Sequence, residues 1–142
     1  MRALLDVNVL IALLDVDHVH HGRARDWLRG HAAKGWASCP ITQNGCIRIM
    51  SQHGYPNALP VAAIIERLAE AARQPGHRFW PDDISLLDER TADGRRIHGP
   101  RKVTDLYLLG LAVKNKGRLA TFDGGIARAA IAGAARQHLT VI

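Results

Sequence analysis

Three aspartates adjoin short apolar segments that lie far apart in the chain. Asp6 follows the apolar residues 3–5, Asp123 follows residues 119–122, and Asp105 opens an apolar segment that ends at Val113. A short hydrophobic run that ends in an acid is typical of a buried strand, and in open α/β sheets ligands bind at the carboxyl ends of the strands. Because Mg²⁺ takes oxygen ligands and favours carboxylates, the three acids predict a metal-dependent enzyme that acts on phosphodiesters.

The elements that must position these acids alternate along the chain. We expect strands at residues 3–6, 36–38, 77–80, 118–122 and 139–142, and helices at residues 9–14, 19–28, 41–50, 60–72, 105–114 and 125–135. Pro40 and Pro60 suit the first turns of two of these helices, where a missing N–H costs nothing. Such alternation predicts an α/β fold with a mainly parallel central sheet covered on both faces. With no linker or repeat, residues 1–142 are expected to form a single domain.

The composition favours a polyanionic partner. Hydrophobic residues make up 47% of the chain, so a full core is possible. The 19 basic and 13 acidic residues give a net charge of +6, which attracts nucleic acid but says nothing about fold. Cys39 and Cys46 lack the spacing of a zinc or redox site, so we interpret them as buried thiols. Free thiols suit the cytoplasm, and no apolar run approaches the length of a membrane span.

Polar residues beside the acids suggest how the site is supported. Asn8 can bond backbone groups of the turn after Asp6 and hold that carboxylate, although an N-capping pair is an equal alternative. Thr104 is a plausible N-cap for the helix that begins at Asp105. The turn-rich loop at residues 92–102 carries cations that could hold phosphates. The candidate RNA-binding residues are Arg48, Arg95, Arg96, Arg101 and Lys102. A solvated loop is the competing interpretation, and His18, His20 and His21 are read as surface or capping residues rather than a soft-metal site.

Three segments together resemble the PIN-domain ribonucleases. They are Leu-Leu-Asp-Val-Asn-Val-Leu-Ile from residue 4, Thr-Asp-Leu-Tyr-Leu-Leu-Gly-Leu-Ala from residue 104, and Leu-Ala-Thr-Phe-Asp from residue 119. Pro-Ile-Thr-Gln-Asn-Gly-Cys-Ile-Arg-Ile at residues 40–49 extends the resemblance over essentially the whole chain. The subgroup that the chain resembles is the VapC toxins of bacterial toxin–antitoxin pairs. The resemblance implies a three-layer α/β/α sandwich and a metal-dependent endoribonuclease that uses Mg²⁺ or Mn²⁺.

The resemblance also assigns roles to individual residues. Asp6, Asp105 and Asp123 match the acidic metal-binding positions of the family, and Thr121 matches a hydroxyl that supports the site. Gln43 stands where the family usually has a fourth acid, a glutamate. Glutamine keeps a carbonyl oxygen but lacks the charge and cannot act as a base. The resemblance therefore implies weaker metal binding or a role transferred to water.

The partners implied by the resemblance are an RNA substrate (with tRNA and rRNA as candidate classes), a small antitoxin laid across a groove, and a second copy of the chain in a homodimer.

The main alternative is a degenerate PIN domain that binds RNA or protein without cutting, and Gln43 is the feature that favours it. A haloacid dehalogenase-type phosphatase is disfavoured because Asn8 stands where that family has its second acid.

Overall fold

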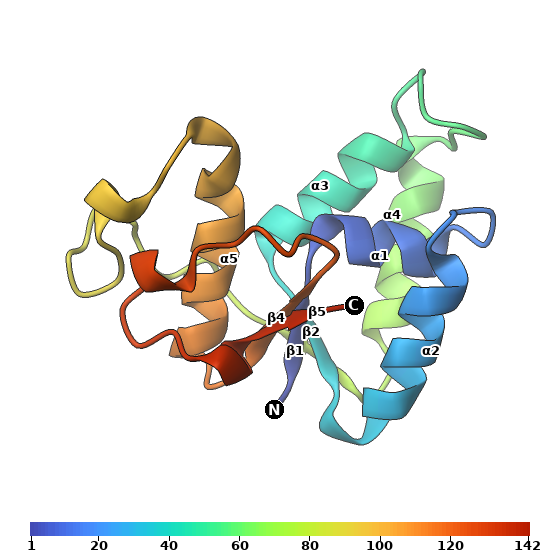
Figure 1. Ribbon diagram of the computed structural model, residues 1–142. Helices are drawn as coiled ribbons and strands as arrows, with labels where there is room; N and C mark the ends of the chain where they lie inside the picture. Colours follow the sequence, from blue (N-terminus) through green and yellow to red (C-terminus); the bar gives the residue numbers. More distant parts are fainter.

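A five-stranded parallel sheet forms the centre of the computed structural model, which describes residues 1–142 (Figure 1). The strands are β1 (Ala3–Leu5), β2 (Trp36–Ser38), β3 (His77–Phe79), β4 (Arg118–Thr121) and β5 (Leu139–Val141). Their order in the sheet is β3-β2-β1-β4-β5, and all four pairings are parallel. The prediction of a mainly parallel sheet is therefore confirmed, and β1 lies at its centre.

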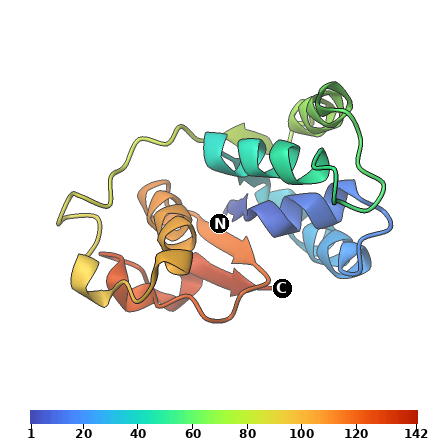
Figure 2. The same cartoon turned by 90° about the horizontal axis from the view of Figure 1, so that it is seen from above.

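Helices cover both faces of this sheet. Four of them lie on one face, α1 (Val7–Leu14), α2 (His21–His31), α3 (Pro40–Met50) and α4 (Val61–Ala72), and α5 (Val103–Lys114) lies on the other (Figures 1 and 2). Successive side chains of a strand point to opposite faces of the sheet, so the strands contribute to one hydrophobic core on each face. Leu5 and Ala120 pack with α1, α3 and α4, whereas Leu4 and Leu119 pack with α5. The molecule is thus the three-layer α/β/α sandwich that the sequence predicts.

The parallel arrangement brings the carboxyl ends of β1 and β4 to the same edge. The backbone N–H of Asp6 donates to the carbonyl of Ala120 over 3.0 Å, which extends the pairing of β1 with β4 by one residue. The first turn of α1 begins directly after Asp6, and α5 also presents its amino end near this edge (Figure 1). Topology alone therefore gathers acids that the sequence separates widely.

The prediction of a helix at residues 125–135 is wrong. Only a 3-10 turn at Arg128–Ala130 forms there. The backbone of this segment bonds instead to the preceding loop, since Asp93 donates to the carbonyl of Ala130 and Ala132 donates to that of Thr91. Gly133 has φ of +74°, a conformation that would interrupt an α-helix. Long-range pairing of the backbone has overridden the alanine-rich composition.

Three helices start two residues away from their predicted positions. α1 begins at Val7, with Asp6 as its N-cap, rather than at residue 9. α2 runs from His21 to His31, later at both ends than predicted. α5 begins at Val103 because a 3-10 turn at Pro100–Lys102 leads into it, so the prediction that Thr104 is its N-cap is wrong.

The core contains both cysteine thiols, which are free and buried as predicted. Burial raises the pKa of Cys46 to about 12, which keeps this thiol protonated. None of the helices has the length and apolar character needed to cross a membrane.

Two helical glycines should respond oppositely to replacement by alanine. A Cβ at Gly45 of α3 would lie 2.8 Å from a methyl carbon of Val7, the first residue of α1, whereas a Cβ at Gly30 of α2 would meet nothing within 4 Å. We expect Gly45→Ala to lower the free energy of unfolding by about 1–2 kcal/mol through overpacking. Gly30→Ala should raise it by about 0.5–1 kcal/mol, because alanine loses less backbone entropy. Urea denaturation of both variants tests the close contact of α3 with α1; equal effects would contradict it.

Candidate acidic site

Asp6 is the most buried acid at this edge of the sheet, with 7% of its surface exposed. Its Oδ1 accepts a hydrogen bond of 2.7 Å from the backbone N–H of Val7, and its Oδ2 accepts one of 2.8 Å from the hydroxyl of Thr121. Burial raises the pKa of Asp6, and repulsion from Asp123 adds to this, while the two hydrogen bonds oppose it. The carboxylate is therefore held in one orientation by β4 and by the first turn of α1.

Asp123 is joined to Asp6 through Thr121. The hydroxyl of Thr121 donates to Asp6 and accepts a bond of 3.1 Å from the backbone N–H of Asp123. The Asp123 carboxylate accepts bonds of 2.7 Å from the ammonium of Lys102 and 2.7 Å from the N–H of Gly125. These two donors, the lysine foremost, hold the pKa of Asp123 below its usual value. Lys102 correspondingly gains a raised pKa from Asp123.

Asp105, in the first turn of α5, completes the acidic group. It is half-buried, and no hydrogen-bond donor of the protein reaches its carboxylate. Burial raises its pKa, and repulsion from Asp6 and then from Asp123 raises it further, against a smaller attraction to Lys102. The three predicted acids thus lie close enough to repel one another, and one of them has unused oxygen lone pairs.

Comparison with known proteins identifies the family. The PIN domain model matches residues 3–132 of the chain. Ribonuclease VapC44 of Mycobacterium tuberculosis is 54% identical over 142 residues, the full length of both proteins. The chain is a PIN-domain protein of the VapC group. Ribonuclease VapC39 of the same organism is 44% identical over 134 residues, which cover 94% of this chain and 96% of the relative.

Solved structures agree with a PIN fold. The crystal structure of VapC20 from Mycobacterium tuberculosis, a sarcin-ricin loop cleaving toxin, superposes with a TM-score of 0.59 at 13% identity, over 87% of this chain and 91% of that one. VapBC2 from Rickettsia felis, bound to a DNA fragment from their promoter, gives a TM-score of 0.57 at 13% identity, over 87% of this chain and 89% of that one. At this identity the likeness concerns the fold alone.

The donor chemistry of the PIN site suits a hard divalent cation. Asp6 and Asp105 offer carboxylate oxygens, and the mutual repulsion of the acids is a cost that a cation would relieve. No group of three histidine, cysteine or acidic side chains is gathered tightly enough to hold a metal ion on its own. Mg²⁺ commonly uses one or two carboxylates and completes its coordination with water and substrate phosphate, so the arrangement fits that ion.

The contacts of the Gln43 side chain involve none of the three aspartates. Its amide nitrogen donates to the hydroxyl of Ser38 over 2.9 Å, and that hydroxyl lies 2.8 Å from Nε2 of His77. The Gln43 side chain also lines a cavity of about 210 Å³ between α3 and α4. Gly45 marks the face of α3 that meets α1, and two residues along a helix turn a side chain by about 200°. The face of α3 that carries Gln43 is therefore turned away from α1, the helix whose N-cap is Asp6.

Of the three predicted support residues, only Thr121 belongs to the hydrogen-bond network of the acids. Asn8 is exposed in the first turn of α1 and makes no side-chain hydrogen bond, while Asp6 itself is the N-cap. Thr104 is exposed and caps nothing. Thr121 is the hydroxyl that links Asp6 to Asp123.

The predicted RNA-binding cations divide into two groups. Arg95 and Arg96 both pair with Asp93, and Lys102 pairs with Asp123 inside the acidic site. Arg48 and Arg101 are exposed and have no carboxylate partner.

The sequence does not predict the contact between Arg23 and Phe122, the residue before Asp123. The guanidinium of Arg23 lies 4.9 Å from the ring centroid of Phe122. The position of Phe122 next to an acid was a visible signal, but nothing in the pattern of α2 indicates that Arg23 reaches it.

Proposed function

We propose that this protein is a metal-dependent endoribonuclease, the toxin of a toxin–antitoxin pair, that hydrolyses RNA phosphodiesters at Asp6, Asp105 and Asp123. The observation that carries the proposal is the convergence of these carboxylates, from β1, α5 and β4, in a chain that is 54% identical to Ribonuclease VapC44 over its full length. Repelling acids at one edge are costly without a cation, and the +6 charge of the chain favours a polyanionic substrate.

The residues of the site have distinct tasks in this proposal. Asp6 is held by Val7 and Thr121, so its oxygens stay fixed, whereas the unengaged carboxylate of Asp105 is available as a ligand. Asp6 and Asp105 would hold a Mg²⁺ or Mn²⁺ ion, which would activate water for attack and offset negative charge on the phosphate. Lys102 supplies positive charge at the same place, and its ammonium can leave the ion pair with Asp123 to bind a phosphate oxygen. No serine or cysteine nucleophile is needed, because the step is direct attack by water.

The partners follow from the same proposal. Relatives named VapC and a structural neighbour described as VapBC2 support a small antitoxin that covers the acidic edge. RNA is the proposed substrate, and the cytoplasm is the proposed location of the activity. The homodimer implied by the family resemblance stays a prediction.

Metal removal tests the proposal directly. Purified, antitoxin-free protein is expected to cut total cellular RNA with Mg²⁺ or Mn²⁺, to stop in excess chelator, and to resume when metal is restored. Gel analysis of the RNA gives the readout, and fragment ends then identify the target. Folded protein that binds RNA without cutting it at any metal concentration would instead support the non-catalytic binding module.

A further inference from the structure

An aromatic–cationic cluster, defined here as His20, Arg23 and Phe122, joins the start of α2 to the end of β4. The Arg23 guanidinium lies over the Phe122 ring at 4.9 Å from its centroid. The ring of His20 approaches the same phenyl ring with centroids 4.8 Å apart and planes tilted by 42°. Both partners come from a segment about a hundred positions earlier in the chain, so only the fold creates this cluster.

The cluster adjoins the acidic site. Phe122 is bonded directly to Asp123, and consecutive Cα atoms are about 3.8 Å apart. The Phe122 side chain packs with the core on the α1–α4 side of the sheet, while the neighbouring Thr121 hydroxyl bonds to Asp6. Lys102 approaches Asp123 from the start of α5. Lys102 thus contacts Asp123 from the α5 side, while the aromatic–cationic cluster lies on the α2 side, at the residue directly before Asp123.

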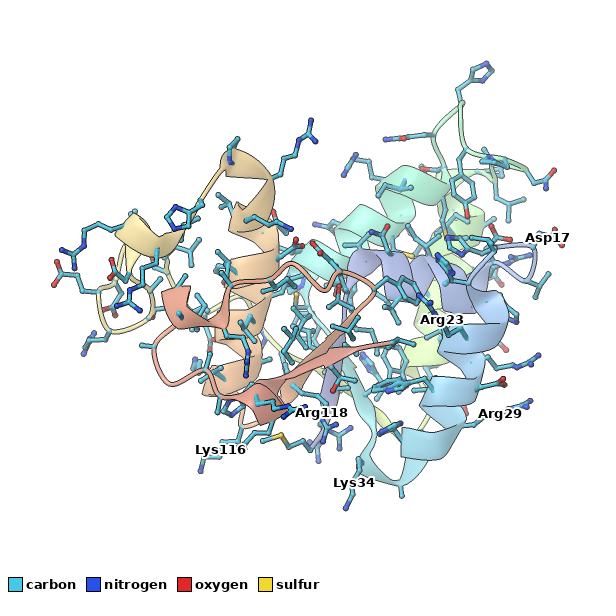
Figure 3. The ribbon with its side chains drawn as sticks, viewed as in Figure 1. Asp17, Arg23, Arg29, Lys34, Lys116 and Arg118 are labelled. Carbon is cyan, nitrogen blue, oxygen red and sulfur yellow. The ribbon has the colours of Figure 1, made fainter.

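Arg23 is the member of this cluster that is free to bind an anion. It is exposed, and it forms no ion pair, in contrast to Arg25 of the same helix, which pairs with Asp26. Figure 3 shows Arg23 extending from α2 toward the middle of the molecule, whereas Arg29 extends away from it. Contact with an aromatic face holds a guanidinium in place and leaves its N–H edges available. A group fixed in this way loses less entropy when it binds a ligand.

We propose that Arg23, held against Phe122 and His20, binds an RNA phosphate that flanks the cleaved bond, and so positions a single strand across Asp6, Asp105 and Asp123. This inference rests on the proposed ribonuclease function and adds a substrate-positioning residue to it. A strand that crosses the acids must continue past Asp123, and Arg23, which contacts the residue before it, carries a positive charge that no carboxylate neutralises. Single-stranded substrates suit the site, because a guanidinium plane can also stack on an unpaired base.

The test compares two exposed, unpaired arginines of α2. Each of Arg23→Gln and Arg29→Gln is made in an Asp6→Asn protein, so that RNA stays intact, and binding of a fluorescein-labelled single-stranded RNA of mixed sequence is measured by anisotropy with Mg²⁺. We expect Arg23→Gln to raise Kd about fivefold and to reduce the slope of log K against log salt by about 0.7, the value for one lost contact with a single strand. Arg29→Gln should change Kd by less than about twofold.

A second variant tests the role of the ring. Phe122→Leu keeps an apolar side chain but removes the aromatic face, so it should weaken binding as much as Arg23→Gln does, and the double variant should lose little more. Equal Kd values for the Arg23 and Arg29 variants would overturn the inference. If the wild-type protein nevertheless cuts RNA, only this inference fails; a wild type that neither cuts nor binds RNA would refute the proposed function as well.

Discussion

Asp6→Asn is expected to reduce the rate of RNA cleavage by about 100-fold or more while leaving the protein folded. Asparagine has nearly the same shape and keeps one oxygen for the backbone N–H of Val7. It removes the negative charge of the most buried acid in the site, the acid to which the Thr121 hydroxyl donates. A divalent cation would then lose a charged ligand whose orientation the protein fixes.

The matched control is Asp17→Asn, the same chemical change in an exposed loop before α2 (Figure 3). The Asp17 carboxylate has no ion pair or hydrogen bond, so cleavage should proceed at the wild-type rate. Initial rates on the same RNA preparation at saturating Mg²⁺ give the comparison, and circular dichroism checks the fold. Full activity in the Asp6→Asn protein would remove Asp6 from the proposed mechanism.

Asp105→Asn is expected to abolish cleavage and, without metal, to raise the melting temperature by about 3 °C. The folded-state pKa of Asp105 lies above the ordinary value of 3.8, because burial and the charges of Asp6 and Asp123 disfavour its ionised form. A raised carboxyl pKa means that stability is greatest below the unfolded pKa and falls as the pH rises through the folded pKa. At pH 7 the ionised Asp105 therefore destabilises the metal-free protein, and a neutral amide relieves that cost.

Two effects reduce the expected gain. Asp105 is only half-buried, so solvent screens part of the repulsion, and an acid in the first turn of α5 has a favourable interaction with the helix dipole that the amide loses. Near pH 3 the wild-type carboxyl is largely protonated, and the difference in melting temperature should shrink. Mg²⁺ should raise the melting temperature of the wild type more than that of Asp105→Asn, because the cation binds the folded site of the wild type.

Thermal unfolding at pH 3 and pH 7, with chelator or Mg²⁺, separates these contributions, and Asp17→Asn again serves as the control. A lower melting temperature for Asp105→Asn at pH 7 in chelator would contradict the repulsion among the three acids. Together, the Asp6 and Asp105 variants test whether the acids that are needed for cleavage lower the stability of the metal-free protein.

Lys102 reduces the electrostatic repulsion among the three acids. Its ammonium neutralises Asp123, which is the one acid of the three whose pKa is lowered rather than raised. The sequence alone predicts that Lys102 acts with the other loop cations in holding phosphate. The structure places it within the acidic site, because the 3-10 turn at Pro100–Lys102 directs the chain toward Asp123. The same charge is available to a phosphate group when one approaches.

The sequence by itself determined the class of fold and the three acids. Short apolar runs before Asp6 and Asp123 indicate strands, and parallel strands must end at a common edge, so the sequence alone predicts that these two carboxylates lie at the same edge. Pro40 and Pro60 similarly marked helix starts, since proline fixes φ and lacks an N–H. These are local or topological consequences of residue type.

The tertiary structure decided the directions of individual side chains and the path of the last connection. Gln43 lies on the face of α3 that meets α4, and its amide bonds to Ser38. The rotation of a helix about its axis decides this direction, and a sequence motif does not encode it. Residues 125–135 form no helix because their backbone groups pair with residues 91–93. Arg23 meets Phe122 only when the fold brings the start of α2 to the residue that follows β4. The last two outcomes depend on contacts between distant segments, and such contacts outweigh local propensity wherever the two compete.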